Sequence, residues 1–78
     1  MQDLVGVYGY RRVASENGSL YYRTDGGTRK LYRISDGRFA IEGTYNMVIE
    51  FDRGEGGTVN KITGRYYRDS FDETYRTP

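Results

Sequence analysis

Glycine recurs so often along this chain that long helices have little room to form. Eleven of the 78 residues are glycine, and between Gly9 and Gly64 no glycine-free stretch exceeds ten residues. Helices typically run about 8–20 residues, and parallel strands need crossover connections of about a dozen residues or more. Only the segment after Gly64 has that length free. The glycine spacing therefore predicts an antiparallel sheet.

The segments between the glycines have the β-branched and aromatic composition of strands. We expect strands at residues 4–13, 20–24, 28–35, 38–42, 46–53 and 58–63, and turns at 16–19, 25–27, 36–37 and 54–57. Gly6 and Gly9 are expected to bend the first strand without ending it. Asn17-Gly18 suits a type I′ hairpin turn, because both residues accept positive φ. In the fifth strand Met47, Ile49 and Phe51 alternate with polar or exposed positions and give one apolar face.

The tail after Gly64 is compatible with two structures. Tyr67, Phe71 and Tyr75 recur at helical spacing, but the residue types of the tail are mostly β-favouring. We therefore favour a final hairpin over a helical turn. The whole chain, residues 1–78, is then a single all-β domain: a small antiparallel barrel or strongly rolled sheet of seven or eight short strands, with little or no helix. Nine tyrosines supply rings for a thin core while keeping their hydroxyls near water.

The residues that enzymes use as nucleophile and base are scarce. The chain has no histidine and no cysteine, and Lys30 and Lys61 stand in no Ser-x-x-Lys pattern. Glu42, Glu50 and Asp52 are the candidate acid–base carboxylates, but we expect them on a solvated face, paired with arginines across strands. Each glycine-rich turn offers a single carboxylate, unlike a calcium loop. We expect no enzyme activity, no catalytic residues, no metal site and no cofactor.

Tyrosine is followed by arginine five times in the chain. Aromatic platforms interleaved with arginine hold single-stranded nucleic acid, yet neighbours in a strand point to opposite faces. The pairs that share a face are Tyr21 with Arg23 and Tyr66 with Arg68. An outward patch around Tyr21, Tyr32 and Tyr66 favours a protein partner. Single-stranded nucleic acid bound by the Tyr/Arg face is an alternative, disfavoured by a net charge of +1 and a pI near 8.0.

Charge and hydropathy bound the remaining partners. Residues 1–40 carry seven basic and four acidic groups, and residues 41–78 carry five and seven, which predicts ion pairs between the two halves. A second alternative is a small ligand inside the barrel, bound by inward-facing Tyr8, Tyr22 and Arg33 in a cavity of about 300 Å³ or more. No apolar run approaches the roughly 20 residues of a membrane span, and residues 1–3 open no signal-peptide pattern. Self-association and excision of the domain from a longer chain both stay open.

Several short motifs, in order, resemble a known domain. They are Leu4-Val5-Gly6-Val7-Tyr8, Gly18-Ser19-Leu20-Tyr21-Tyr22, the anchors Leu31 and Phe39, and Ile49-Glu50-Phe51-Asp52-Arg53 followed by Gly57-Thr58-Val59. This order is similar to the lipocalin-like C-terminal domain of unknown function that follows the catalytic domain of β-lactamase-like serine hydrolases. The resemblance spans roughly residues 4–65 and does not extend to the tail. It implies a non-catalytic, extracytoplasmic accessory barrel that packs on a hydrolase domain or another protein.

Overall fold

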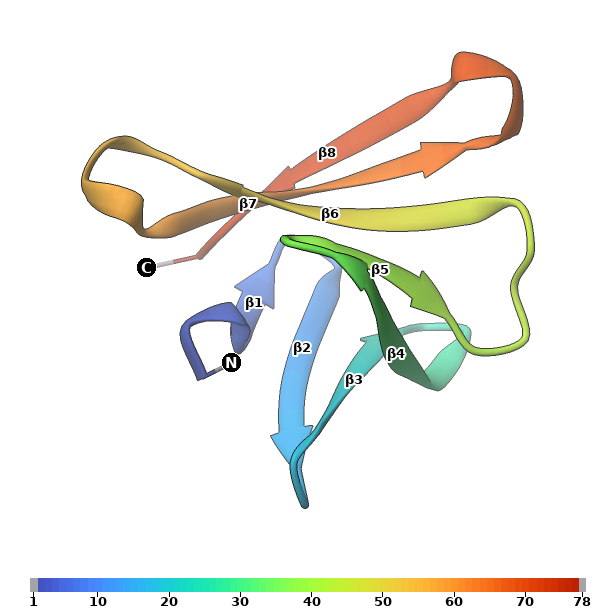
Figure 1. The fold of residues 1–78 in the computed structure, drawn as a ribbon, viewed down its shortest axis with the longest axis horizontal. Coiled ribbons are helices and arrows are strands. Elements are labelled where there is room, and N and C mark those ends of the chain that lie inside the picture. The colour runs from blue at the N-terminus through green and yellow to red at the C-terminus, as the bar shows by residue number, and fades with distance from the viewer. Residues whose placement is uncertain (1, 78) are drawn as a thin grey trace.

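A computed structural model describes residues 2–77, whose strands form one eight-stranded antiparallel sheet in sequence order (Figure 1). The strands are β1 (Gly6–Tyr8), β2 (Arg11–Glu16), β3 (Ser19–Thr24), β4 (Gly27–Ser35), β5 (Arg38–Ile41), β6 (Met47–Arg53), β7 (Val59–Tyr66) and β8 (Phe71–Tyr75). Short 3₁₀ turns occupy η1 (Gln2–Leu4), η2 (Glu55–Gly57) and η3 (Tyr67–Asp69). The described residues contain no α-helix. The predicted all-β antiparallel fold is confirmed.

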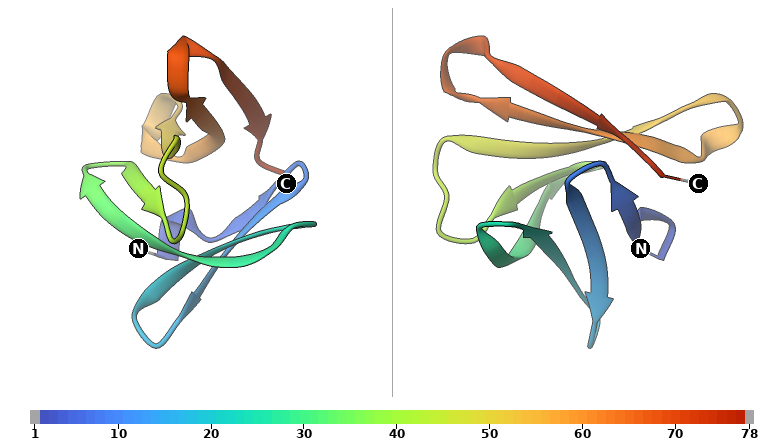
Figure 2. Two further views of the ribbon diagram at one scale, coloured as in Figure 1. Left: turned by 90° about the vertical axis from the view of Figure 1, so that its right-hand side faces the viewer. Right: turned by 180° about the vertical axis from the view of Figure 1, so that it is seen from behind.

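The sheet rolls until its first and last strands meet, giving a nearly closed barrel (Figure 2). Tyr8 and Arg76 form an antiparallel bridge, and the Thr77 N–H donates to the Val7 carbonyl at 2.7 Å. The Arg76 guanidinium donates to the Val5 carbonyl at 2.6 Å and lies over the Tyr8 ring, 5.6 Å from its centroid. One end of the seam between β1 and β8 is therefore closed by backbone pairing and by a single arginine.

Side chains fill the interior of the barrel. The buried apolar residues are Leu4, Tyr8, Val13, Leu20, Tyr22, Leu31, Phe39, Ile41, Ile49, Phe51, Val59 and Ile62. The ring of Phe51 meets those of Tyr8 and Phe39 edge-on, at centroid distances of 6.0 and 5.5 Å, a favourable aromatic geometry. Ile49 and Phe51 are buried and Met47 packs against them, so the predicted apolar face of β6 is confirmed.

The predicted first strand, residues 4–13, is wrong as a single element. It folds into η1 and then the β1–β2 hairpin, which turns at Gly9 and Tyr10 and pairs Tyr8 with Arg11. Gly9 has φ of +63°, a conformation that glycine adopts without the steric cost of a Cβ. The chain thus reverses where we expected it only to bend.

The turns expected at Asn17-Gly18 and in the tail are confirmed. Asn17 and Gly18 have φ of +52° and +82°, as a type I′ turn requires. The tail forms the hairpin β7–η3–β8, in which the 3₁₀ turn η3 makes the connection, and Gly64 pairs with Asp72. Arg68 adopts a positive φ of +69° within η3, which ends the strand alternation at Tyr66.

A buried arginine closes the other part of the seam. Arg11 on β2 is fully buried and donates to Tyr22 Oη at 3.0 Å, Thr74 Oγ1 at 3.1 Å and Asp72 Oδ1 at 2.5 Å. Gly64 makes room for it, because a Cβ there would lie 2.6 Å from Arg11 Nη2. The core therefore contains an arginine beside the tyrosine rings that the sequence predicted. In the Tyr10-Arg11 dipeptide the arginine points inward and the tyrosine outward, because the turn at Gly9 sets the alternation of β2.

Candidate functional site

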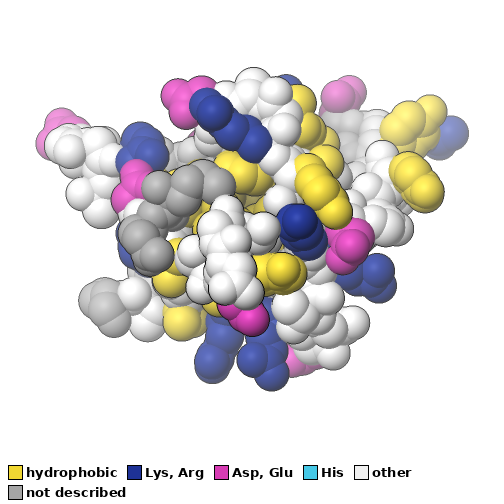
Figure 3. Space-filling model, turned by 60° about the horizontal axis from the view of Figure 1, so that its bottom comes forward, with side chains coloured by type: hydrophobic (Ala, Val, Ile, Leu, Met, Phe, Trp, Pro, Cys, Tyr) yellow, Lys and Arg dark blue, Asp and Glu magenta, His cyan; other side chains and the backbone are white. Residues whose placement is uncertain are grey.

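A groove of about 670 Å³ lies over the outer face of β1, β2 and β3. Its lining comes from the beginning of β1, most of β2 and the facing part of β3 and β4: Val5, Gly6, Val7, Arg12, Val13, Ala14, Glu16, Tyr21, Arg23 and Thr28. Seen from the side of the β2–β3 turn, apolar side chains gather near the middle of the molecule with Lys and Arg side chains beside them (Figure 3). Among the lining residues, Val5, Val7 and Ala14 give the groove apolar surface, and Arg12 and Arg23 give it positive charge.

Strand register explains which side chains reach the groove. Arg12 pairs with Val7 on one side and with Arg23 on the other, while Ala14 pairs with Tyr21. Their neighbours on β2, Arg11 and Val13, are buried, and successive residues of a strand point to opposite faces. Arg12 and Ala14 thus lie outward, side by side with a tyrosine and a second arginine.

Three basic side chains of this face have no acidic partner among the described residues. Within the part of the chain that the structure describes, no carboxylate oxygen lies within 4.0 Å of the charged nitrogens of Arg12, Arg23 or Lys30. Arg12 stands directly opposite Arg23, an unfavourable cross-strand pairing of like charges. Glu16, at the far end of the groove, is the acidic residue of the lining. The predicted pairing between the two halves of the chain leaves these three cations out.

The outer face of β5 to β8 is different. Glu50 accepts from Arg38 Nε at 3.1 Å and from Arg65 Nε at 2.7 Å, and Lys61 pairs with Glu73 at 2.5 Å. The predicted cross-strand pairing of Glu50 with arginines is confirmed. Asp52 instead accepts a hydrogen bond from the Thr63 hydroxyl at 2.6 Å.

The sequence-predicted binding residues separate into two groups. Tyr21 and Arg23 both line the groove, and Tyr32 lies two residues beyond Lys30 on the same face of β4, with the Lys30 Nζ 5.3 Å from its ring centroid. Tyr66 turns toward the seam and donates its hydroxyl hydrogen to Asp72 Oδ1 at 3.1 Å. The predicted single patch around Tyr21, Tyr32 and Tyr66 is therefore wrong in its third member.

Arg68 also lies outside the groove. Its guanidinium lies over the ring of the neighbouring Tyr67, 5.7 Å from the centroid. Because η3 interrupts the alternation after Tyr66, the expected shared face of Tyr66 and Arg68 is not formed.

The residues expected to line an internal ligand cavity have different environments. Tyr8 and Tyr22 are buried in the packed core, where burial raises the pKa of each phenol. Arg33 keeps the expected strand face, opposite Phe39, but it lies at the mouth of the barrel and its side chain is 62% exposed. The expectation that Arg33 lines a closed interior is wrong, because β4 extends past the core at this point.

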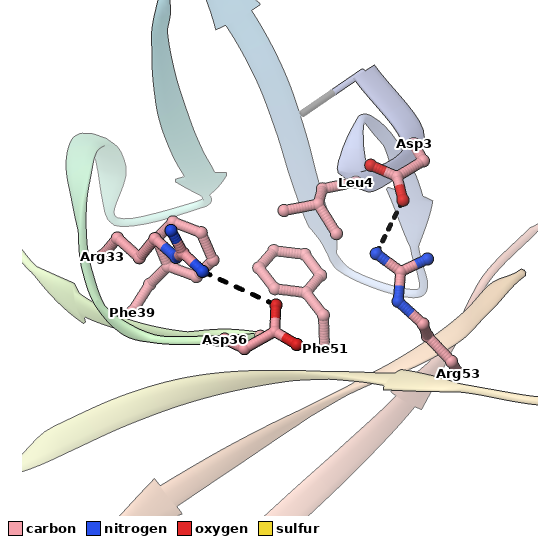
Figure 4. A pocket seen from close by; sticks show the side chains of 8 residues that line it. Asp3, Leu4, Arg33, Asp36, Phe39, Phe51 and Arg53 are labelled. Carbon is pink, nitrogen blue, oxygen red and sulfur yellow. Dashed lines mark ion pairs between the residues drawn. The ribbon is translucent and has the colours of Figure 1, made fainter. Parts of the chain in front are cut away.

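The mouth beside Arg33 is a hollow of about 240 Å³ floored by Leu4, Phe39 and Phe51 (Figure 4). Its charged rim is paired: Arg53 contacts Asp3 at 2.6 Å and Arg33 contacts Asp36 at 3.7 Å. The hydrogen bond from Arg53 lowers the pKa of Asp3. In contrast to the groove, this mouth has its charges already matched.

Comparisons with known proteins identify no relative. A scan against models of known protein families, a search of curated proteins and a search of solved structures each returned no match. The resemblance to the lipocalin-like domain therefore stays a prediction. In the described range no helix has the length and apolar character needed to cross a membrane. Across residues 2–77, His, Cys, Asp and Glu side chains do not gather in groups of three or more that could hold a metal ion.

Sequence reasoning missed Arg12, Val7 and Ala14 as groove residues. The alternation of β2 places Arg12 and Ala14 on the outer face, but this follows only if the strand begins at Arg11. A strand running through residues 4–13 gives no reason to place Val7 next to Arg12, since both would belong to one strand. The turn at Gly9 brings them together.

Proposed function

We propose that this chain is a non-catalytic β-barrel module that binds another protein through the groove on β1 to β3. The observation that carries the proposal is the facing of Arg12 and Arg23, which have no carboxylate partner among the described residues, beside the apolar surface of Val7, Ala14 and Tyr21. Protein interfaces combine an apolar, aromatic centre with a polar rim and are enriched in tyrosine and arginine.

The alternatives have less support. A small ligand inside the barrel competes with a core in which Tyr8, Leu20, Ile49 and Ile62 are almost wholly buried. The mouth beside Arg33 offers charges that are already paired. The resemblance to the accessory domain of serine hydrolases supports a hydrolase domain as the partner. On that reading the module packs on the hydrolase or restricts access to it.

Selection of random peptides displayed on phage tests this function without assuming a partner. Peptides are selected on the wild-type domain and then measured on Ala14→Gln, which fills the floor of the groove with a longer neutral side chain. Ala40→Gln is the matched control, because Ala40 lies on the outer face of β5, away from the groove.

The proposal expects peptides that bind the wild type and Ala40→Gln alike and bind Ala14→Gln at least about tenfold more weakly, a loss of about 1.4 kcal/mol. Failure to enrich any peptide, or equal binding to all three proteins, would contradict it. Circular dichroism confirms that each variant keeps the β-sheet spectrum of the wild type.

A further inference from the structure

We infer that the groove recognises an extended acidic protein segment, in which an Asp or Glu side chain lies between Arg12 and Arg23 and apolar neighbours lie on Val7, Ala14 and Tyr21. The inference rests on the proposed function and deepens it, because it states the chemistry of the partner. Its occupant is a protein segment with side-chain carboxylates.

The two arginines supply the anchoring charge. They are directly opposite each other on adjacent strands, both are exposed, and no described carboxylate lies within reach of either guanidinium. A carboxylate placed between them accepts charge-assisted hydrogen bonds from both, which are stronger than neutral ones. It also relieves the repulsion of like charges across the strands. Lys30, which is paired with Tyr21 on the neighbouring strand, adds to the positive field.

The apolar surface sets the shape of the bound segment. Val7 is 37% exposed, and Tyr21 and Val5 are partly exposed, so apolar side chains next to the anchor have surface to cover. Arg12 and Glu16 lie on the same face of β2, four residues apart, a distance of about 13 Å in an extended strand. The groove therefore holds about four residues of extended chain, with the acidic residue at the Arg12 end and away from Glu16.

Glu16 also argues for a protein segment over a nucleic acid. A single strand carries a phosphate at every nucleotide, so a strand running along the groove brings negative charge past Glu16. An acidic peptide can place a neutral residue there. Tyr21 is the aromatic residue of the lining, whereas single-strand binding surfaces stack successive bases on several aromatic rings.

Fluorescence anisotropy of labelled peptides tests the inference on the full chain. The probe is fluorescein-Gly-Ser-Asp-Val-Asp-Val-Gly-Ser, and its two twins carry Asn or Lys in place of both Asp residues. A fluorescein-labelled oligothymidine of eight nucleotides is the fourth probe. Each probe is titrated at low and at high salt, because ionic strength screens exposed charges.

Two double variants separate position from net charge. Arg12→Gln/Arg23→Gln removes the anchor, and Arg33→Gln/Arg68→Gln removes two exposed arginines that lie outside the groove. Both lower the formal net charge by the same amount. Circular dichroism and urea denaturation confirm that both proteins are folded.

We expect the Asp peptide to bind at least tenfold more tightly than the Asn peptide, with the Lys peptide weaker still. Arg12→Gln/Arg23→Gln should weaken the Asp peptide by about 100-fold, from two charge-assisted contacts of about 1.4 kcal/mol each, and Arg33→Gln/Arg68→Gln by less than threefold. Equal binding of Asp and Asn peptides overturns the inference, as does equal loss in the two double variants. Tighter binding of oligothymidine than of the Asp peptide overturns it in favour of nucleic acid. If phage selection yields neutral peptides that depend on the groove, this inference fails while the proposed function stands.

Discussion

The outer face of β5 to β8 and the outer face of β2 to β4 differ in whether their basic side chains contact carboxylates. On β5 to β8, Glu50 lies between Arg38 and Arg65, and Lys61 contacts Glu73. On β2 to β4, Arg12 and Arg23 stand opposite each other without a carboxylate in reach among the described residues. On β5 to β8, the paired half, the three basic side chains already have acidic partners. The unpaired half retains charge that a partner can neutralise.

The largest expected effect on the free energy of unfolding concerns Arg11, the buried arginine that connects β2 to β8. Arg11 lies on β2, but its guanidinium binds Asp72 and Thr74 on β8. Replacing it by methionine keeps apolar bulk and leaves the hydrogen-bonding groups of Asp72 and Tyr22 without this partner. We expect Arg11→Met to lower the free energy of unfolding by about 2–4 kcal/mol, in urea denaturation. The neighbouring Arg12→Met should stay within about 0.5 kcal/mol of the wild type. Equal losses in the two variants would remove the distinction between paired and unpaired arginines.

A second change tests the space in which Arg11 lies. At Gly64 a Cβ would lie 2.6 Å from Arg11 Nη2 and 2.8 Å from both Asp72 Oδ1 and Met47 Cε. Gly64→Ala therefore displaces the ion pair of Arg11 with Asp72, and we expect a loss of about 1–3 kcal/mol in the free energy of unfolding. Gly18 has open space around it, but its positive φ makes it a poor comparison. Gly26→Ala is the better control, because its nearest neighbour is 3.5 Å away and its φ is not positive.

Acid should weaken the seam at Asp72. Burial alone would raise the pKa of Asp72, but hydrogen bonds from Tyr10, Arg11 and Tyr66 and the charge of Arg11 lower that pKa overall. A carboxyl whose pKa is lower in the folded state adds stability above its unfolded pKa of about 3.9, and this stability is lost as the pH falls through the folded value. Unfolding monitored between pH 6 and about pH 2 should therefore show a smaller acid-dependent loss for Asp72→Asn than for the wild type. An unchanged pH profile would mean that Asp72 does not couple the seam to pH.

The smallest expected changes in the free energy of unfolding have opposite signs on the two halves. Arg23→Glu places a carboxylate opposite Arg12 and should raise the free energy of unfolding by about 0.2–1 kcal/mol. Glu50→Gln removes the shared partner of Arg38 and Arg65 and should lower it by up to about 1 kcal/mol. Thermal and urea unfolding of both variants give the comparison. If Arg23→Glu is destabilising, the groove arginines already have a favourable role in the free domain.

Local signals in the sequence were sufficient for much of the fold. Asn17-Gly18 dictates its turn from two residues, and Met47, Ile49 and Phe51 show their common face by spacing alone. The reversal at Gly9 was not readable, because the residues on both sides of it favour strands. Burial of Arg11 depends on Asp72, 61 residues away, so no local pattern could reveal it.

The candidate site was predicted only in part for the same reason. Tyr21 and Arg23 lie two residues apart on one strand, and alternation was enough to place them together. Arg12 and Val7 join them through the pairing of β1 with β2, which required the turn at Gly9. Tyr66 does not belong to the predicted patch, because its side chain lies toward Asp72 and its hydroxyl donates a hydrogen bond to that carboxylate.

Mapping amide chemical shifts during titration with the Asp-Val peptide shows where the ligand lies on the intact domain. We expect perturbations concentrated at residues 5–7, 12–16 and 21–23, with little change at Glu50, Lys61 and Arg65 on the paired half or at Arg33 and Phe51 around the mouth. Perturbations centred on the paired half or on the mouth would contradict the assignment of binding to the unpaired half of the barrel.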